Sequence, residues 1–209
     1  MVNNGQNLKK RSFKSGTKDV KKQNNHDVKK RKVKGKTGGG VLTKTQKAFL
    51  NFLKQFTYPK VYGVGAMAGV CLLLIMYISA KYTPFGESAN YQELIRLIDE
   101  TPVASFIIAI FPPILEEFIC RKVIFGFLKK YSKLLAYGIS SVVFTLGHYQ
   151  FSVTKCYEEL NTTPTYFISG LVLAYTYNST GYLLSSMFAH YINNGGIALL
   201  RTLGLWLNN

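Results

Sequence analysis

The feature that most constrains the fold is a run of twenty residues without a charge, "VYGVGAMAGVCLLLIMYISA" at 61–80. At a helical rise of about 1.5 Å per residue, this run is long enough to cross a hydrocarbon core about 30 Å thick. It is too long for the apolar region of a signal peptide. Aromatic residues and lysines flank it in "FTYPKVYG" and "KYTPFG", as is typical of the membrane interface. The run therefore predicts a transmembrane helix.

Four more apolar segments follow this run along the chain. They cover 103–128, 134–151, 164–178 and 181–200. A short amphipathic segment, "YQELIRLIDE", lies between the first two spans, and the closing "RTLGLWLNN" could add a short helix. Trp206 in this closing segment is an expected interfacial anchor. We therefore expect an all-α fold, a polytopic transmembrane helix bundle of about five to six spans.

Charge divides the chain into two parts. Residues 1–47 carry fifteen Lys/Arg and two Asp, whereas 48–209 carry eleven Lys/Arg and eight Asp/Glu. Because 1–47 has almost no apolar periodicity, we expect a disordered basic tail before a membrane domain at 48–209. The cluster "KKRKVKGK" at 29–36 is compatible with nucleic-acid contact, but a polybasic segment beside a membrane domain more often binds anionic lipid. We favour lipid and expect no nucleic-acid partner.

The charged loops also predict an orientation. Lys129, Lys130 and Lys133 fall on the same side as the tail, and the acidic segments 83–100 and 157–159 fall on the other. Cytoplasmic loops of membrane proteins carry the excess of Lys and Arg. We therefore expect a multi-pass protein of the cell membrane with its N-terminus in the cytoplasm.

Polar and ionisable residues interrupt the predicted spans at one depth. Measured by the helical rise from the basic side, those in three of the spans lie roughly 15–22 Å into the membrane. Such residues are costly in a bilayer, face the interior of a helix bundle and mark functional sites. In the last span they form a stripe that repeats every four residues. We therefore expect one polar cluster formed by Glu116, Glu117, His148, His190 and Asn194.

The two adjacent glutamates have different neighbours. Glu117 and Arg121 are four residues apart and can pair on one face of a helix. Glu116 is then the carboxylate without a cationic partner, and such a group can act as a general base. An intramembrane ion pair that only orders the helix is an equally good interpretation of Glu117 and Arg121. The two interpretations do not exclude each other.

Two further local patterns bear on this cluster. Pro112 and Pro113 remove two backbone donors, so we expect the helix to kink or break there and to line a wet cavity. Phe144 lies four residues before His148, so its ring can wall the imidazole. A lone buried histidine is more often structural than catalytic, and only the convergence of several polar residues favours a site.

Three motifs occur in order on successive predicted membrane helices. They are "EEFICR", "FTLGH" and "HYINN", with the patterns Glu-Glu-x-x-x-Arg, Phe-x-x-x-His and His-x-x-x-Asn. In this order they resemble the CPBP family, which comprises CAAX prenyl proteases of the Ras-converting-enzyme type and bacterial Abi proteins, including bacteriocin-processing and self-immunity proteins. The resemblance covers about residues 60–205 and excludes the basic tail.

The resemblance implies an intramembrane endopeptidase of the glutamate type, acting near the C-terminus or leader of a membrane-associated protein or peptide. Bacteriocin processing or self-immunity is one role that it implies. Carried over by position, Glu116 would activate water, and His148 would hold and polarise that water. His190 and Asn194 would stabilise the oxyanion of the tetrahedral intermediate. The residues that would support this site are Glu117, Arg121 and Phe144.

Other functions fit parts of the same pattern. Carboxylates and histidines could hold zinc, although the chain has no His-Glu-x-x-His motif, and we expect no metal or other cofactor. A non-catalytic immunity or interaction protein could use the same fold. A proton- or ion-coupled transporter would also carry intramembrane Glu and His, but we find no internal inverted repeat and few spans.

Overall fold

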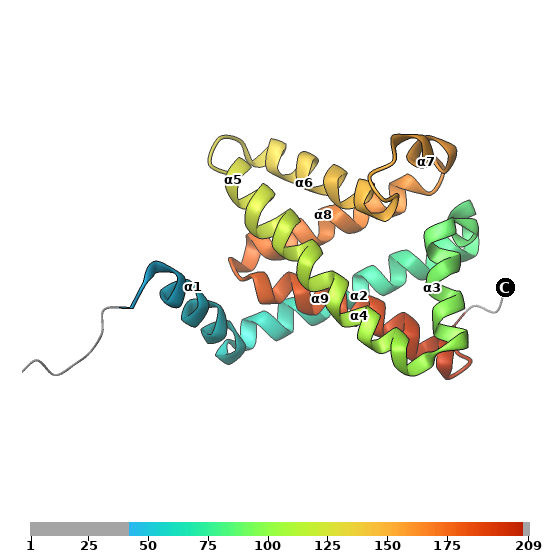
Figure 1. Ribbon diagram of the computed structural model, residues 1–209, viewed down its shortest axis with the longest axis horizontal. Helices are drawn as coiled ribbons and strands as arrows, with labels where there is room; N and C mark the ends of the chain where they lie inside the picture. Colours follow the sequence, from blue (N-terminus) through green and yellow to red (C-terminus); the bar gives the residue numbers. More distant parts are fainter. Residues whose placement is uncertain (1–41, 207–209) are drawn as a thin grey trace, which may run out of the picture. The chain divides into compact units, whose positions relative to one another are not determined.

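The computed structural model describes residues 42–206, and the expected all-α fold is confirmed because this part contains helices and no strand (Figure 1). In chain order the elements are α1 (Lys44–Leu53), η1 (Lys54–Thr57), α2 (Pro59–Tyr82), η2 (Pro84–Glu87), α3 (Ala89–Glu100), α4 (Pro102–Glu117), η3 (Phe118–Phe125), α5 (Gly126–Leu128), α6 (Lys133–His148), α7 (Val153–Glu158), α8 (Thr163–Thr180) and α9 (Leu183–Thr202). The elements η1 and η2 are 3-10 helices, and η3 is a π-helix.

The helices follow the apolar segments of the sequence closely. The five predicted spans correspond to α2, to α4 with η3 and α5, to α6, to α8 and to α9, and the amphipathic segment forms α3. By length and composition, α2 is the one helix in residues 42–206 that is long and apolar enough to cross a membrane. The number of spans stays a prediction.

The surface of α2 is suited to lipid. Only 28% of its most apolar eighteen residues is buried, whereas a core helix of a soluble protein is mostly buried. Its exposed large apolar side chains recur every three or four residues and so share one face. A continuous exposed face of this kind marks a contact with membrane or protein. The side chains on it are Met67, Val70, Leu74 and Ile78.

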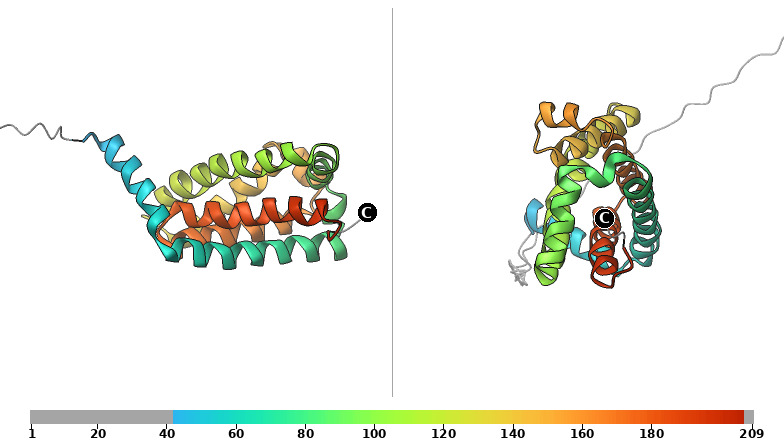
Figure 2. Two further views of the ribbon diagram at one scale, coloured as in Figure 1. Left: turned by 90° about the horizontal axis from the view of Figure 1, so that it is seen from below. Right: turned by 90° about the vertical axis from the view of Figure 1, so that its right-hand side faces the viewer.

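Small residues bring the central helices close together. In Figure 2, α2, α8 and α9 run side by side along the bundle. A Cβ atom added at Gly69 of α2 would lie 2.6 Å from Ile192 of α9, and one added at Gly170 of α8 would lie 3.0 Å from Ser141 of α6. Small residues permit such close helix packing in membranes. The first seam holds α9, the helix with the polar stripe, against α2, and the second holds α8 against α6.

The helix α3 lies across one end of the bundle and is fixed there by side chains (Figure 1). The Trp206 indole donates a hydrogen bond to the Tyr91 hydroxyl of α3 at 2.9 Å. Arg201, in the last turn of α9, makes two hydrogen bonds to Asp99 at 2.8 and 2.9 Å. The expectation of Trp206 as an interfacial anchor is wrong, because the ring is buried against α3 and Tyr77.

The prolines of α4 do not interrupt it. The helix continues through Pro112 and Pro113 to Glu117, so the expected break is absent. The fixed φ of proline is compatible with a helix, at the cost of backbone hydrogen bonds. The departure from α geometry comes five residues after Pro113, where the π-helix η3 begins at Phe118. Such π-helical turns occur frequently at functional sites.

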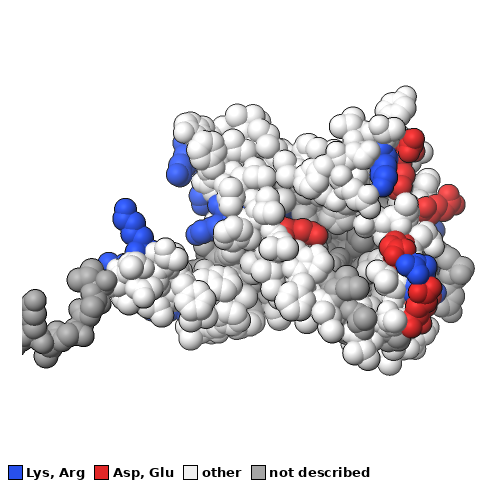
Figure 3. Space-filling model, viewed as in Figure 1, with Lys and Arg blue, Asp and Glu red and all other residues white. Residues whose placement is uncertain are grey.

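The charged residues gather at the two ends of the bundle. In Figure 3, one end shows Lys and Arg without Asp or Glu, the other shows Asp and Glu together with some Lys and Arg, and a nearly uncharged belt with one acidic patch lies between. This distribution is consistent with the predicted orientation. The predicted tail reaches to residue 47, yet α1 begins at Lys44, so 44–47 are helical. Residues 1–41 lie outside the described residues, and their disorder stays a prediction.

Candidate active site

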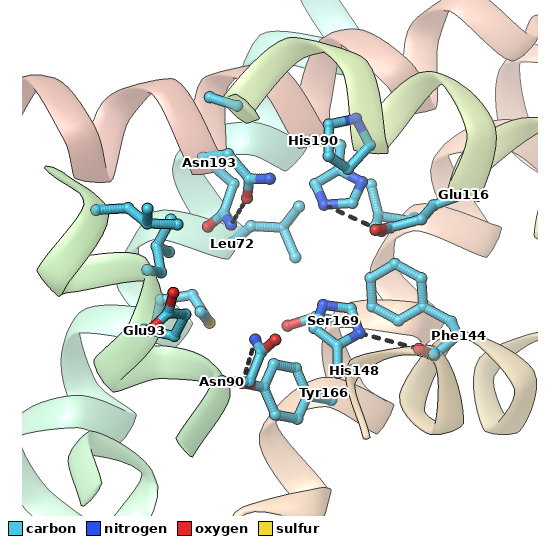
Figure 4. A pocket seen from close by; sticks show the side chains of 18 residues that line it. Leu72, Asn90, Glu93, Glu116, Phe144, His148, Tyr166, Ser169, His190 and Asn193 are labelled. Carbon is cyan, nitrogen blue, oxygen red and sulfur yellow. Dashed lines mark hydrogen bonds and ion pairs between the residues drawn. The ribbon is translucent and has the colours of Figure 1, made fainter. Parts of the chain in front are cut away.

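A cavity of about 230 Å³ lies between α2, α3, α4, α6, α8 and α9 (Figure 4). All four of the predicted catalytic residues come to its wall, from the three helices α4, α6 and α9. Apolar side chains such as Leu72 and Leu173 form much of the rest. The predicted site residues that line the cavity are Glu116, Phe144, His148, His190 and Asn194, whereas Glu117 and Arg121 do not line it.

Glu117 and Arg121 form the expected ion pair. Arg121 Nε lies 3.2 Å from Glu117 Oε2, and both side chains are fully buried. Two other helices hold the guanidinium. It donates to the Gly170 carbonyl of α8 at 3.3 Å and lies 4.8 Å from the centre of the Phe144 ring of α6. Burial of an ion pair costs desolvation energy, and the contacts of Arg121 with Gly170 and Phe144 help to offset it. Arg121, held by these contacts, in turn fixes the position of Glu117.

His190 lies between the two glutamates. Its Nδ1 is 3.2 Å from Glu117 Oε1, a hydrogen bond, and its Nε2 is 3.8 Å from Glu116 Oε2 (Figure 4). Because a carboxylate accepts, Nδ1 carries a proton, and this bond sets the orientation of the ring. The remaining nitrogen, Nε2, faces Glu116. Glu117 thus orients the imidazole, and Glu116 lies beside it.

Glu116 differs from Glu117 in its access to solvent. The Glu116 side chain is 38% exposed, whereas Glu117 is fully buried. The Glu116 Oε2 atom is itself buried and has no hydrogen-bond partner in the described chain. The closest ion-pairing group is His190 Nε2, at a separation beyond hydrogen-bond length. A carboxylate with one unused oxygen at a cavity wall can accept a proton from a bound water.

His148 is held on the opposite side of the cavity. Its Nδ1 donates to the Phe144 carbonyl at 2.9 Å, and its ring packs against Tyr166 with centroids 4.2 Å apart. In the neutral ring the other nitrogen, Nε2, is therefore an acceptor. The Phe144 ring also lies against His148 and His190, with centroid distances of 4.7 and 5.6 Å. Phe144 thus forms a common wall for both imidazoles, as its spacing from His148 indicated.

The structure adds Asn193 to the candidate site. Its side chain is 6% exposed and lines the cavity, and its Nδ2 donates to Asn194 Oδ1 at 2.9 Å. This bond occupies the acceptor of the Asn194 amide and leaves the Asn194 NH₂ group for the cavity. The four-residue stripe missed Asn193 because a neighbouring residue lies about 100° away around the helix. The sequence "NN" was the one available signal.

Tyr166 and α3 complete the cavity and were also missed. Tyr166 stacks on His148 and accepts a hydrogen bond from Asn90 of α3 at 3.0 Å. A second cavity of about 340 Å³ shares Asn90, Glu93 and His148 with the first and continues to α7. The second cavity therefore lies next to the candidate site, on the side of α7. A tyrosine in an apolar span gives no signal of this role.

A metal centre finds no ready ligand set. In the part of the chain from residue 42 to 206, no group of three or more His, Cys, Asp or Glu side chains is arranged to hold a metal ion. Zinc needs at least three such protein ligands at a catalytic site. The chelation experiment described below tests the zinc alternative.

Comparison with known proteins gives two kinds of match. The family model described as "Type II CAAX prenyl endopeptidase Rce1-like" matches residues 99–196, which contain all three motifs. The chain is 30% identical over 159 residues to "Membrane-embedded CAAX protease MroQ" of Staphylococcus aureus, covering 69% of this chain and 61% of the relative. It is 32% identical over 127 residues to "Putative membrane peptidase YdiL" of Bacillus subtilis, covering 59% of this chain and 48% of the relative.

The chain thus spans about three fifths of the first relative, from its 61% coverage, and about half of the second, from its 48% coverage. No solved structure matches it. The family match contains the three motifs, and each motif supplies at least one residue to the wall of the cavity in Figure 4. Together, these matches and the motifs support the resemblance of the chain to proteases of the CPBP family.

Proposed function

We propose that this chain is an intramembrane endopeptidase that hydrolyses a peptide bond near the C-terminus or leader of a membrane-associated protein or peptide. The observation that carries the proposal is the position of His190, which Glu117 orients toward Glu116 at the wall of the cavity. The names of the two relatives, a CAAX protease and a putative membrane peptidase, support the same activity.

In the proposed reaction, Glu116 acts as the general base. It removes a proton from water as the water oxygen attacks the carbonyl carbon of the substrate. His148, an acceptor at Nε2, holds the second hydrogen of that water. When the C–N bond breaks, the proton on Glu116 passes to the leaving nitrogen, so the products are an amine and a carboxylic acid. No other reactant is consumed.

His190 and Asn194 are the proposed donors to the oxyanion. Negative charge develops on the carbonyl oxygen, and fixed donors aimed at it lower the barrier. His190 offers Nε2–H when that nitrogen is protonated, and Asn194 offers its NH₂ group because Asn193 occupies its oxygen. Glu117, Arg121 and Phe144 support these donors through the contacts described above. No metal or other cofactor takes part in this proposal.

The proposed location is the cell membrane, in several spans, with the N-terminus in the cytoplasm. The exposed apolar face of α2, the separation of charge and the names of both relatives support it. The proposed partners are the membrane-associated substrate and anionic lipid at the basic tail. We expect no nucleic-acid partner.

The decisive experiment compares cells that express wild type, Glu116→Gln or Glu158→Gln at equal levels. Glu158 lies in α7 on the surface and serves as a charge-matched control. New peptides and protein termini should appear with wild type and the control and be absent with Glu116→Gln. Identical profiles for all three, with the cellular effect retained, would favour a non-catalytic immunity or interaction protein instead.

A second arm addresses zinc. The purified chain should keep its cleavage of the identified substrate after treatment with a chelator. If the chelator abolishes activity and zinc restores it, the mechanism is metal-dependent, and Glu116 does not activate the water by itself.

A further inference from the structure

The apolar face of α1 and η1 has no place in the proposed chemistry. Its side chains are spaced as i, i+4 and i+7 from Phe49, so they share one helix face. They are between 43% and 61% exposed, and no residue of α1 is buried. The side chains are Phe49, Leu53 and Phe56.

The opposite face of the same segment is basic. At 100° per residue, Lys44, Lys47, Asn51 and Lys54 fall on the side away from Phe49. A helix with a large apolar face and lysines on the other is typical of segments that lie in a membrane interface. A mobile polar linker would not need apolar side chains on one face and lysines on the other.

This helix is well formed and anchored. Thr43 and Gln46 form a capping box at its start, which satisfies two free backbone donors. Phe52 packs against the core cluster that contains Phe125, and Gln55 Oε1 accepts a hydrogen bond from the Leu184 backbone at 3.0 Å. The segment is therefore tied to the first turn of α9 while its apolar face stays uncovered.

The position along the chain identifies what covers that face. The apolar helix α2 starts at Pro59, two residues after η1, so α1 lies at the end where the membrane span begins. Tyr58 and Tyr62, both exposed, are placed as interface aromatics. Lysines of α1 and of the residues before it complement anionic headgroups.

We propose that α1 and η1 lie in the plane of the cytoplasmic membrane surface. The face with Phe49, Leu53 and Phe56 inserts among the acyl chains, and the lysines contact anionic headgroups. The segment thereby fixes the depth at which α2 enters the membrane. This inference rests on the membrane location in the proposed function and not on peptidase activity.

Site-directed spin labels in the full chain, reconstituted in vesicles, test the proposal. The three native cysteines are replaced by alanine, and collision with oxygen and with a water-soluble nickel complex reports depth. A label at Leu74 of α2 serves as the internal reference. The labels that are compared replace Phe49, Leu53, Lys47, Asn51 and Leu74 one at a time.

In vesicles with anionic lipid, labels at Phe49 and Leu53 should lie about 5–10 Å below the headgroups, and those at Lys47 and Asn51 should stay in water. If Leu74 is deep while all four α1 labels are in water, the inference is overturned and the membrane location stands. A water-exposed Leu74 would overturn the membrane location itself.

Two further outcomes would also overturn the inference. Equal insertion in neutral and anionic vesicles would remove the role of the lysines. Dipolar broadening between labels at Phe49 of two molecules would show that a second copy covers the face instead of lipid.

Discussion

Two arginine clusters in this protein have similar composition and opposite surroundings. Arg96 on α3 lies 2.7 Å from both Glu93 and Glu100, and all three side chains are more than half exposed. Arg121 lies 3.2 Å from Glu117, and both are fully buried. The shorter contacts are the weaker ones, because water screens them and the long side chains lose entropy when they pair. Burial, more than distance, decides what each cluster contributes.

The largest expected effect comes from breaking the buried cluster. Arg121→Met leaves the Glu117 carboxylate buried without its cation, so we expect a loss of about 3–5 kcal/mol in the free energy of unfolding. Arg96→Met should have a much smaller effect, because water already screens its two ion pairs. Chemical denaturation in detergent measures both. Equal effects of the two variants would contradict the comparison.

A double variant sharpens this test. Glu117→Gln together with Arg121→Met removes both charges, and we expect it to regain most of the lost stability. It should not regain activity, since the Glu117 carboxylate that orients His190 is absent.

The next effect concerns Glu116, whose exposure lies between those of the two clusters. Glu116→Gln should lower kcat by about 10²–10⁴-fold, the usual contribution of a general base. Its stability should change little, because no hydrogen bond to its Oε2 is lost. Steady-state cleavage of the substrate found above and denaturation of the same samples give both values. A variant as active as wild type would exclude Glu116 as the base.

A smaller effect is expected at Asn193. Asn193→Asp removes the donor to Asn194 Oδ1, so the Asn194 amide can turn its oxygen to the cavity. We expect kcat to fall about 10-fold with little change in KM, equal to about 1.4 kcal/mol at the transition state. Asn178→Asp, on α8 and away from the cavity lining, is the matched control.

A second variant, Asn194→Ala, tests whether Asn193 acts through Asn194. If Asn193 acts through Asn194, Asn193→Asp should lower kcat no further in the Asn194→Ala background. Independent, additive losses would show that Asn193 acts by another route.

The smallest effect belongs to the partly exposed pair of Asp99 and Arg201. The Arg201 guanidinium, through its hydrogen bonds, lowers the pKa of Asp99. The pair therefore stabilises the fold above the ordinary aspartate pKa of about 3.9, and this contribution is lost as pH falls through the lower pKa. Because Asp99 is about half exposed, its side chain at 48%, we expect less than about 1 kcal/mol.

Thermal unfolding of wild type and Asp99→Asn in detergent at pH 7 and pH 3 measures this contribution. The advantage of the wild type should be smaller at pH 3 than at pH 7. A difference that persists unchanged at pH 3 would assign the stabilisation to packing and not to charge.

The sequence predicts the helices well because apolar length is a strong local signal. The five long helical segments, α3 and the pair of Glu117 and Arg121 all follow from spacing within single helices. The meeting of three helices at one depth follows from the helical rise, because bundle helices run side by side.

What the sequence misses depends on side-chain direction or on distant partners. Asn193 acquires its role from one hydrogen bond to its neighbour, and Tyr166 from a stack on His148. Trp206 is apolar and near the end of the chain, so it resembles an interfacial anchor, but Tyr91 lies where it can accept the indole N–H. The π-helix after α4 has no sequence pattern that distinguishes it from an α-helix.

The close helix seams also determine which side of the bundle can admit a substrate. One added methyl group would overlap Ile192 between α2 and α9 at Gly69, and it would press on Ser141 between α6 and α8 at Gly170. A peptide cannot pass through contacts of this kind unless the helices separate completely. The cavity wall formed by α3 depends instead on side chains, among them Leu94 and Leu97. The glycines thus close two sides, and we expect α3 to be the gate through which a substrate enters and its products leave.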